Sequence, residues 1–127
     1  MLDTDTVSFA MRGLGRVAER ILDHPPSALC MSAITVAELR FGADKRGSKK
    51  LHELIDVFAA SVQPVEFDAA AALHFGRLGS ELARRGVPIG RFDTLIAAHA
   101  IALDLTFVTN NARHFDRVTG LRCENWL

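Results

Sequence analysis

The chain has 127 residues, which at roughly 100–200 residues per domain predicts one domain with one compact site. Hydrophobic residues make up 49% of the sequence and charged residues 24%, a balance that excludes disordered and fibrous proteins. Fifteen Lys and Arg residues balance fifteen Asp and Glu residues, so the formal charge is zero and the broad basic surface of a DNA-coating protein is excluded.

Hydrophobic periodicity and capping residues predict short apolar strands and helices in the first half of the chain. In order, we expect the tail of a strand at Met1–Asp3, helices at Thr6–Arg12 and Arg16–Leu22, a strand at Ala28–Met31, and helices at Ala33–Asp44 and Lys49–Ala60.

The second half continues the alternation. In order, we expect a strand at Val62–Phe67, helices at Ala69–Arg85 and Asp93–Leu103, a strand at Leu105–Thr109, a helical turn at Ala112–Phe115 and an edge strand at Leu121–Glu124. Such alternation without hairpin signals is typical of an α/β sandwich with a mainly parallel sheet. Ligands of these sheets bind at the carboxyl ends of the strands, which is where we look for a site.

Side chains with oxygen atoms gather at that end of the predicted sheet. Asp3 follows the first strand, Glu38 lies one turn into the helix after the second, and Asp93 opens a later helix. Three more polar residues follow the strand that ends at Thr109, namely Asn110, Asn111 and Asp116. Oxygen ligands without His or Cys partners suit Mg²⁺ or Mn²⁺ and predict metal-assisted attack on a phosphate ester. Taken singly, each acid also fits a helix cap, so the spacing alone leaves both interpretations open.

The residues around these acids form four ordered motifs. They are LDTDT at 2–6, ITVAELRFG at 34–42, PIGRFDTLIAAHA at 88–100, and VTNN at 108–111 followed by Phe115. Together they resemble the motifs of PIN-domain ribonucleases, and most of all those of the VapC toxins of bacterial toxin–antitoxin pairs. The resemblance implies one PIN domain over residues 1–127. Its fold is a PIN-like (Rossmann-like) three-layer sandwich with a mainly parallel central sheet of four to five strands.

The resemblance also implies roles for the acids. Asp3 and Asp93 correspond to metal-binding aspartates. Glu38 corresponds to the glutamate of the E-L-x-x-G motif, which we assign to orienting or deprotonating the attacking water.

Residues after the last strand are expected to complete the site. The resemblance implies that Thr109 and Asn110 help to position the metal ligands. Asp5 is expected to contact the metal-binding residues without binding the metal itself. Many PIN domains have an aspartate where this chain has Asn111. Either Asn111 coordinates through its carbonyl oxygen or Asp116 supplies the missing carboxylate from one turn further on.

The function implied is that of a Mg²⁺-dependent endoribonuclease, with Mn²⁺ as a substitute, that hydrolyses RNA through a metal-activated water. Transfer RNA is the expected substrate and Arg91 a candidate phosphate contact, although Arg91 fits equally well as the partner of a nearby carboxylate. The resemblance implies a homodimer and a small VapB-like antitoxin. We expect the antitoxin to insert a basic side chain into the acidic cleft and to lay a helix in an apolar groove formed by the helices around 34–41 and 51–58.

Two other functions remain possible at this point. The G-x-G-x-x-A match at Gly13–Ala18 is the weak signature of a dinucleotide-binding Rossmann site, but it follows a predicted helix, and the glycines fit better as a joint between two helices. A non-catalytic PIN-like interaction module is the other alternative. The basic run Lys45–Lys50 fits a solvated loop better than an RNA contact, and His74 and His99 fit structural roles better than catalysis.

Targeting and redox signals are weak. Cys30 and Cys123 form no metal or redox motif, which favours a reducing compartment. Asp3 and Asp5 stand where a secretory signal carries basic residues, and no apolar run reaches the ~18 residues that span a bilayer. We therefore expect a cytoplasmic protein that does not enter a membrane.

Overall fold

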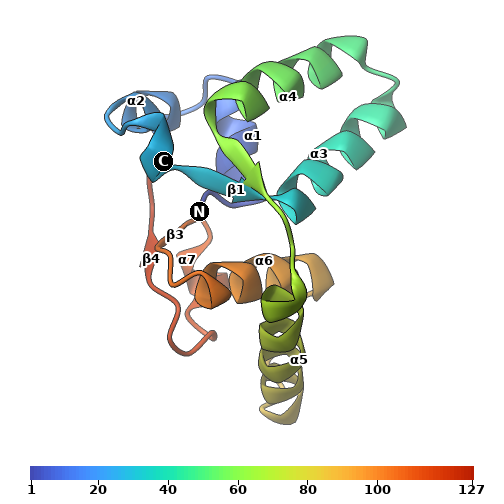
Figure 1. Ribbon diagram of the computed structural model, residues 1–127, viewed down its shortest axis with the longest axis vertical. Helices are drawn as coiled ribbons and strands as arrows, with labels where there is room; N and C mark the ends of the chain where they lie inside the picture. Colours follow the sequence, from blue (N-terminus) through green and yellow to red (C-terminus); the bar gives the residue numbers. More distant parts are fainter.

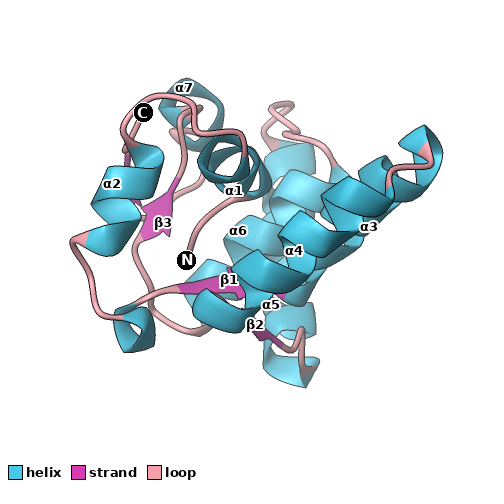
Figure 2. Cartoon of the chain, turned by 90° about the horizontal axis from the view of Figure 1, so that it is seen from above, coloured by secondary structure: helices cyan, strands magenta, loops and turns pink.

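The computed structural model describes residues 1–127, in which helices cover short parallel strands (Figure 1, Figure 2). The strands are β1 (Cys30–Ser32), β2 (Gln63–Val65), β3 (Phe107–Val108) and β4 (Cys123–Glu124). The helices are α1 (Thr4–Met11), α2 (Val17–Leu22), α3 (Ala33–Arg46), α4 (Lys49–Ser61), α5 (Ala69–Arg84), α6 (Arg91–Ala102) and α7 (Ala112–Phe115), with a 3-10 turn at Pro26–Ala28. The predicted alternation of strands and helices is confirmed.

The strands are shorter than predicted. β1 pairs with β2 and β3 pairs with β4, both in parallel, while Leu2 alone forms parallel bridges to the β1 residue Met31 and the β3 residue Val108. Parallel pairing is thus confirmed, but a continuous sheet of four to five strands is not. Two local causes shorten the ladders. The turn at Pro26–Ala28 includes Ala28, which was expected in β1, and Pro64 in β2 has no N–H to donate, which suits an edge strand.

The hydrophobic core divides into two clusters because successive residues of a strand face opposite sides. Met1 and Phe107 belong to one cluster, with residues of α5, α6 and α7. Leu2 and Val108 belong to the other, with residues of α1, α3 and α4. Helices therefore pack on both faces of the strands, as the predicted sandwich requires.

Two helices begin two residues earlier than predicted, and both shifts concern the expected site. Asp3 caps α1, because its side chain accepts a hydrogen bond from the backbone N–H of Thr6, so the helix starts at Thr4. Gly90 has φ +92°, a conformation that favours glycine, and α6 starts directly after it. Arg91 and Asp93 consequently share the first turn of α6.

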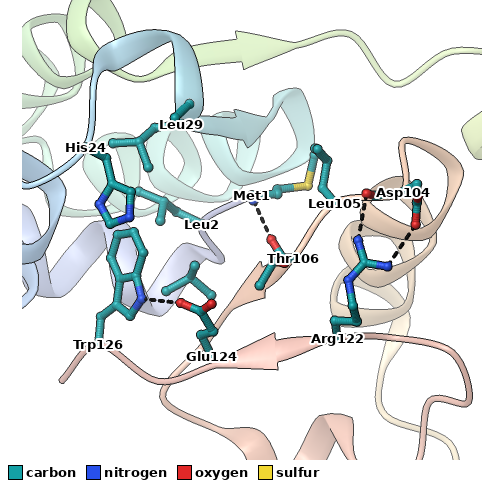
Figure 3. Close-up of a pocket in the computed structure, with 12 residues that line it drawn as sticks. Met1, Leu2, His24, Leu29, Asp104, Leu105, Thr106, Arg122, Glu124 and Trp126 are labelled. Atoms are coloured by element: carbon teal, nitrogen blue, oxygen red, sulfur yellow. Dashed lines mark hydrogen bonds and ion pairs between the residues drawn. The ribbon is translucent and has the colours of Figure 1, made fainter.

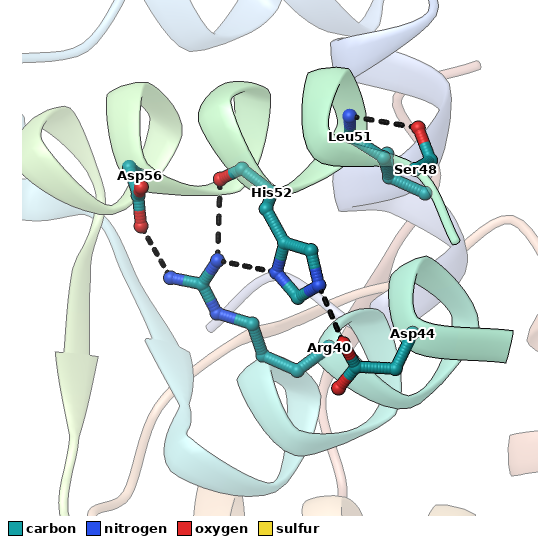
Figure 4. A network of polar contacts seen from close by, with 6 residues as sticks. All are labelled: Arg40, Asp44, Ser48, Leu51, His52 and Asp56. Atoms are coloured by element: carbon teal, nitrogen blue, oxygen red, sulfur yellow. Dashed lines mark hydrogen bonds and ion pairs between the residues drawn. The ribbon is translucent and has the colours of Figure 1, made fainter. Parts of the chain in front are cut away.

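A polar network links α3 to α4 (Figure 4). The Arg40 guanidinium contacts the Asp56 carboxylate, the backbone oxygen of His52 and the His52 ring, and the other nitrogen of that ring lies 2.8 Å from Asp44 Oδ1. The basic run Lys45–Lys50 covers the last residues of α3, the turn at Gly47 and Ser48, and the first residues of α4, so most of the expected inter-helix loop is helical.

Two alternatives from the sequence are decided by the fold. Gly13 and Gly15, both with positive φ, join α1 to α2, so no strand precedes the G-x-G-x-x-A match and the Rossmann interpretation is wrong. His99 is buried, with Nδ1 2.8 Å from Ser32 Oγ, which confirms its structural role. None of the helices combines the length and the hydropathy needed to cross a membrane.

A pocket of about 370 Å³ lies beside the residues that lead into β3 and β4 (Figure 3). Trp126 closes one side, where its ring stacks on His24 at 4.8 Å and its Nε1 donates to Glu124. On the other side Arg122 contacts Asp104. The predicted catalytic acids do not line this pocket.

Candidate active site

Asp3 is the most buried of the predicted acids. It follows Leu2, which lies between the two strand pairs, and its backbone N–H donates to the Val108 oxygen at 2.9 Å. Burial raises the pKa of the Asp3 carboxyl, and hydrogen bonding to Thr109 and Thr6 partly opposes that rise. The fully buried Thr109 thus contacts Asp3 directly.

Glu38 lies on α3 and is held by a residue that the sequence did not single out. Thr4 Oγ1 donates to Glu38 Oε1 at 2.6 Å and lies 3.2 Å from Thr35 Oγ1. Burial raises the pKa of Glu38, the Thr4 hydrogen bond opposes the rise, and the negative charges of Asp93, Asp5 and Asp3 add to it. Carboxylates from two other segments of the chain, the start of α1 and the start of α6, therefore act on Glu38.

Asp93 is positioned by His114, a second residue that sequence reasoning missed. His114 Nε2 lies 3.0 Å from Asp93 Oδ2 and 2.8 Å from the backbone oxygen of Ile89. Because both neighbours are acceptors, Nε2 carries a hydrogen and donates to them. The only signal in the sequence was the place of His114 one turn after the strand end at Thr109. Burial raises the pKa of Asp93, His114 opposes the rise, and Asp5 adds to it.

Asp5 affects the other acids through its charge rather than as a helix cap. Asp3 makes the backbone hydrogen bond at the start of α1, so Asp5 is not needed as a cap. Its exposed carboxylate instead adds negative charge that raises the pKa of Asp3, Glu38 and Asp93 alike.

Of the three polar residues after β3, Asn110 and Asn111 lie on the Asp3 side of the site and Asp116 does not. Asn111 is exposed, and its backbone N–H donates to Thr109 Oγ1, which binds this turn to the Asp3 side of the site. Asn110 Oδ1 is buried without a hydrogen-bond partner. Asp116 lies at the other end of α7, and its charge raises the pKa of Cys123 but acts on none of the three principal acids.

Arg91 is exposed at the start of α6. The partner of Asp93 is His114, so the guanidinium of Arg91 is not used by the nearest carboxylate. It therefore remains available to an anion from solution.

Comparison with known proteins decides the family. The PIN-domain model matches residues 1–121. The chain belongs to the PIN-domain family. It is 39% identical to the tRNA(fMet)-specific endonuclease VapC of Shigella flexneri, over 99% of this chain and 96% of that protein. Ribonuclease VapC2 of Haemophilus influenzae is 36% identical over 100% of this chain and 97% of its own length. Within the PIN family the chain thus groups with the VapC ribonucleases.

Solved structures agree with this grouping. A crystal structure of VapBC2 from Rickettsia felis, bound to a DNA fragment from its promoter, superposes with a TM-score of 0.90 and 34% identity, covering 100% of this chain and 98% of that one. DNA-bound VapBC from Salmonella typhimurium superposes with a TM-score of 0.89 and 38% identity, covering 100% and 97%. The PIN-domain α/β fold is therefore confirmed.

The donor chemistry of this PIN domain fits a hard divalent cation. The converging groups offer oxygen only, and the buried Asn110 Oδ1 is an acceptor without a partner. No three Asp, Glu, His or Cys side chains yet stand close enough to share one ion.

We predict that Glu38→Gln stabilises the protein when divalent cations are chelated. The pKa of folded Glu38 is raised above its ordinary value near 4.5, so protonation favours folding below that value and the benefit is lost as pH rises through the folded pKa. At neutral pH the ionised carboxylate therefore opposes folding. Glu38 is half-buried, so solvent screens the repulsion, and its contribution to the free energy of unfolding is less than about 1 kcal/mol. We therefore expect the Tm to rise by up to about 4 °C at pH 7.

Thermal unfolding of both proteins in EDTA from pH 3.5 to 8 measures this effect, and the gain should fade toward acid pH. Added Mn²⁺ should stabilise the parent more than the variant. A lower Tm for Glu38→Gln across the whole pH range would contradict the repulsion that we infer.

Proposed function

We propose that this PIN domain is a Mg²⁺-dependent endoribonuclease and the toxin of a VapBC-type pair. The observation that carries the proposal is the charge around Glu38: Asp3 and Asp93, which come from other elements, both raise the pKa of Glu38, and burial raises the pKa of all three acids. A remnant site has no need to keep three costly charges together. The VapC ribonucleases and VapBC complexes to which the chain is similar support the same reaction.

The three acids would have different roles in the reaction. Asp3 and Asp93 would hold the cation, which when bound supplies charge neutralisation at the scissile phosphate and acidifies water there. Thr4 occupies Oε1 of Glu38, so Oε2 is the oxygen that orients the attacking water and accepts its proton. The raised pKa makes Glu38 a better proton acceptor than an exposed glutamate. The water would attack phosphorus as the bond to the 3′ oxygen breaks, and that oxygen would leave with a proton from solvent, so the products would be a 5′-phosphate and a 3′-hydroxyl.

Transfer RNA is the substrate that we propose, and initiator tRNA is the first to test, since the relative from Shigella flexneri is named for it. Purified protein incubated with end-labelled initiator tRNA should produce discrete fragments in Mg²⁺ or Mn²⁺ and none in EDTA. Mapping the ends should show a 5′-phosphate. Cleavage that persists in EDTA, or fragments ending in a cyclic phosphate, would contradict the mechanism.

We propose Asn111 rather than Asp116 as the fourth group of the site. Asn111 lies next to Thr109, which supports Asp3, whereas the charge of Asp116 is directed to Cys123. We expect Asn111→Ala to lower kcat/KM about tenfold or more, the scale of groups that support metal ligands, and Asp116→Ala to change it little. The same tRNA assay measures both, and the reverse order would assign the role to Asp116.

We propose that the antitoxin lays a helix in an apolar groove of about 320 Å³. Nine of its ten lining residues are hydrophobic, and among them Leu22 of α2 is 84% exposed and Val57 of α4 is 70% exposed. The walls come from α1, α2 and α4, so this groove includes the expected α4 but not residues 34–41 of α3. The reason is that Leu39 of α3 points into the core, where it packs with residues of α1 and α4.

The groove continues toward the acids, which supports insertion of a basic side chain. Met11 and Leu54 line both this groove and an adjoining pocket of about 250 Å³ that Glu38 also lines. A helix in the groove followed by a short tail would therefore reach Glu38. An antitoxin guanidinium there would satisfy carboxylates that otherwise repel one another. A homodimer of the toxin remains part of the proposal.

A further inference from the structure

Two phenylalanine rings stand exposed beside the catalytic acids. Phe41 is 70% exposed and Phe92 is 53% exposed. Phe41 follows Glu38 by three residues on α3 and so shares its face of the helix, while Phe92 directly precedes Asp93 on α6. Neither ring belongs to either core cluster. The fold therefore does not account for them.

The two rings border one pocket. Its volume is about 390 Å³, within the range of roughly 300–1,000 Å³ of small-molecule sites. Ala37, Glu38, Phe41 and Phe92 form its whole lining. The pocket thus combines two flat apolar rings with a carboxylate of the proposed catalytic set.

This composition selects a particular occupant. Apart from Glu38 the lining offers no hydrogen-bonding side chain, so it cannot read the edge of a base but can contact its flat face. Arg91, next to Phe92, is exposed and available for a phosphate. The pocket also shares Glu38 with the proposed catalytic set, so its occupant lies next to the reacting phosphate. An unpaired base joined to a phosphate meets all three conditions.

We propose that Phe41 and Phe92 hold an unpaired base of the RNA next to the scissile phosphate. The inference rests on the ribonuclease function proposed above and adds how the substrate is positioned. Stacking on aromatic rings accepts any base, so the pocket selects single-stranded RNA rather than one sequence. Duplex RNA, whose bases are already stacked on each other, is excluded.

Binding of a fluorescent single-stranded RNA oligonucleotide tests the proposal, measured by anisotropy in an Asp93→Asn background that prevents cleavage. We expect Phe41→Leu and Phe92→Leu each to weaken binding about 5- to 150-fold, the effect of losing one stacked base. Phe41→Tyr and Phe92→Tyr keep the ring and should bind as the parent does. Phe9→Leu, on α1 outside the pocket, is the matched control and should have little effect.

Oligonucleotides with one abasic position, moved along the strand, make the test specific. The parent should lose affinity at one position, and the Leu variants should show no further loss there. Additive losses, or unchanged binding by the Leu variants, would overturn the base pocket. If the Leu variants instead convert a dimer to a monomer on size exclusion without this non-additivity, the rings form a protein interface and the proposal is wrong.

The activity of the unmodified chain separates this proposal from the function on which it rests. Cleavage of RNA by the parent together with normal binding by the Leu variants would reject only the base pocket. Failure of the parent to bind or cleave any RNA in Mn²⁺ would reject both.

Discussion

Asp93→Asn abolishes RNA cleavage in our proposal while the fold stays intact. Asp93 contributes one of the charges that hold the cation, and His114 holds its carboxylate toward the site. A bound metal ion supplies several kcal/mol of transition-state stabilisation, and each 1.36 kcal/mol is a factor of ten, so we expect kcat/KM to fall at least about 100-fold. Stability should change little, because the lost attraction to the start of α6 is offset by relief of repulsion from Asp5.

Cleavage of labelled tRNA in Mg²⁺ measures the loss, and thermal unfolding checks the fold. Asp104→Asn is the matched control, because it makes the same chemical change at an exposed aspartate that pairs with Arg122 and lies outside the site. Its φ of +53° is one that asparagine tolerates. Full activity of Asp93→Asn in Mg²⁺ would disprove the metal-site model.

Val57→Glu should release the toxin from its antitoxin. Val57 is exposed on α4 and lines the apolar groove, so the change does not disturb the core but places an unpaired charge under the bound helix. Such a buried charge costs at least about 1–3 kcal/mol, which corresponds to roughly 5- to 150-fold weaker binding. In cells the variant should remain toxic at antitoxin levels that protect against the parent.

Co-expression with a VapB-like antitoxin, followed by co-purification and titration, measures this affinity. Leu73→Glu on α5 is the matched control, since Leu73 is 55% exposed and lies outside the groove. Light scattering of the free toxins tests the proposed homodimer in the same samples. Equal antitoxin affinity for Val57→Glu and the parent would show that the helix docks elsewhere.

The sequence was a good guide to features that depend on neighbouring residues. Periodicity located every strand and helix because one buried face repeats within a few positions. Boundaries were less well predicted, as at β1 and α6, because capping by Ser32, a turn at Pro26–Ala28 and the positive φ of Gly90 decide them. The lengths of the strands were overestimated because such local turns, which periodicity does not reveal, end the strands early.

By itself the sequence determined the α/β class and the family, because local periodicity and ordered motifs do not depend on contacts between distant residues. The choice of Asp3, Glu38 and Asp93 as the principal acids stays a prediction. Only the tertiary structure decided which distant groups meet. His114 reaches Asp93 across 21 positions, Thr4 reaches Glu38 across 34, and the groove joins α1 and α2 to α4. These pairings depend on how helices pack on the two faces of the strands, and packing between elements leaves no periodic signal in the chain.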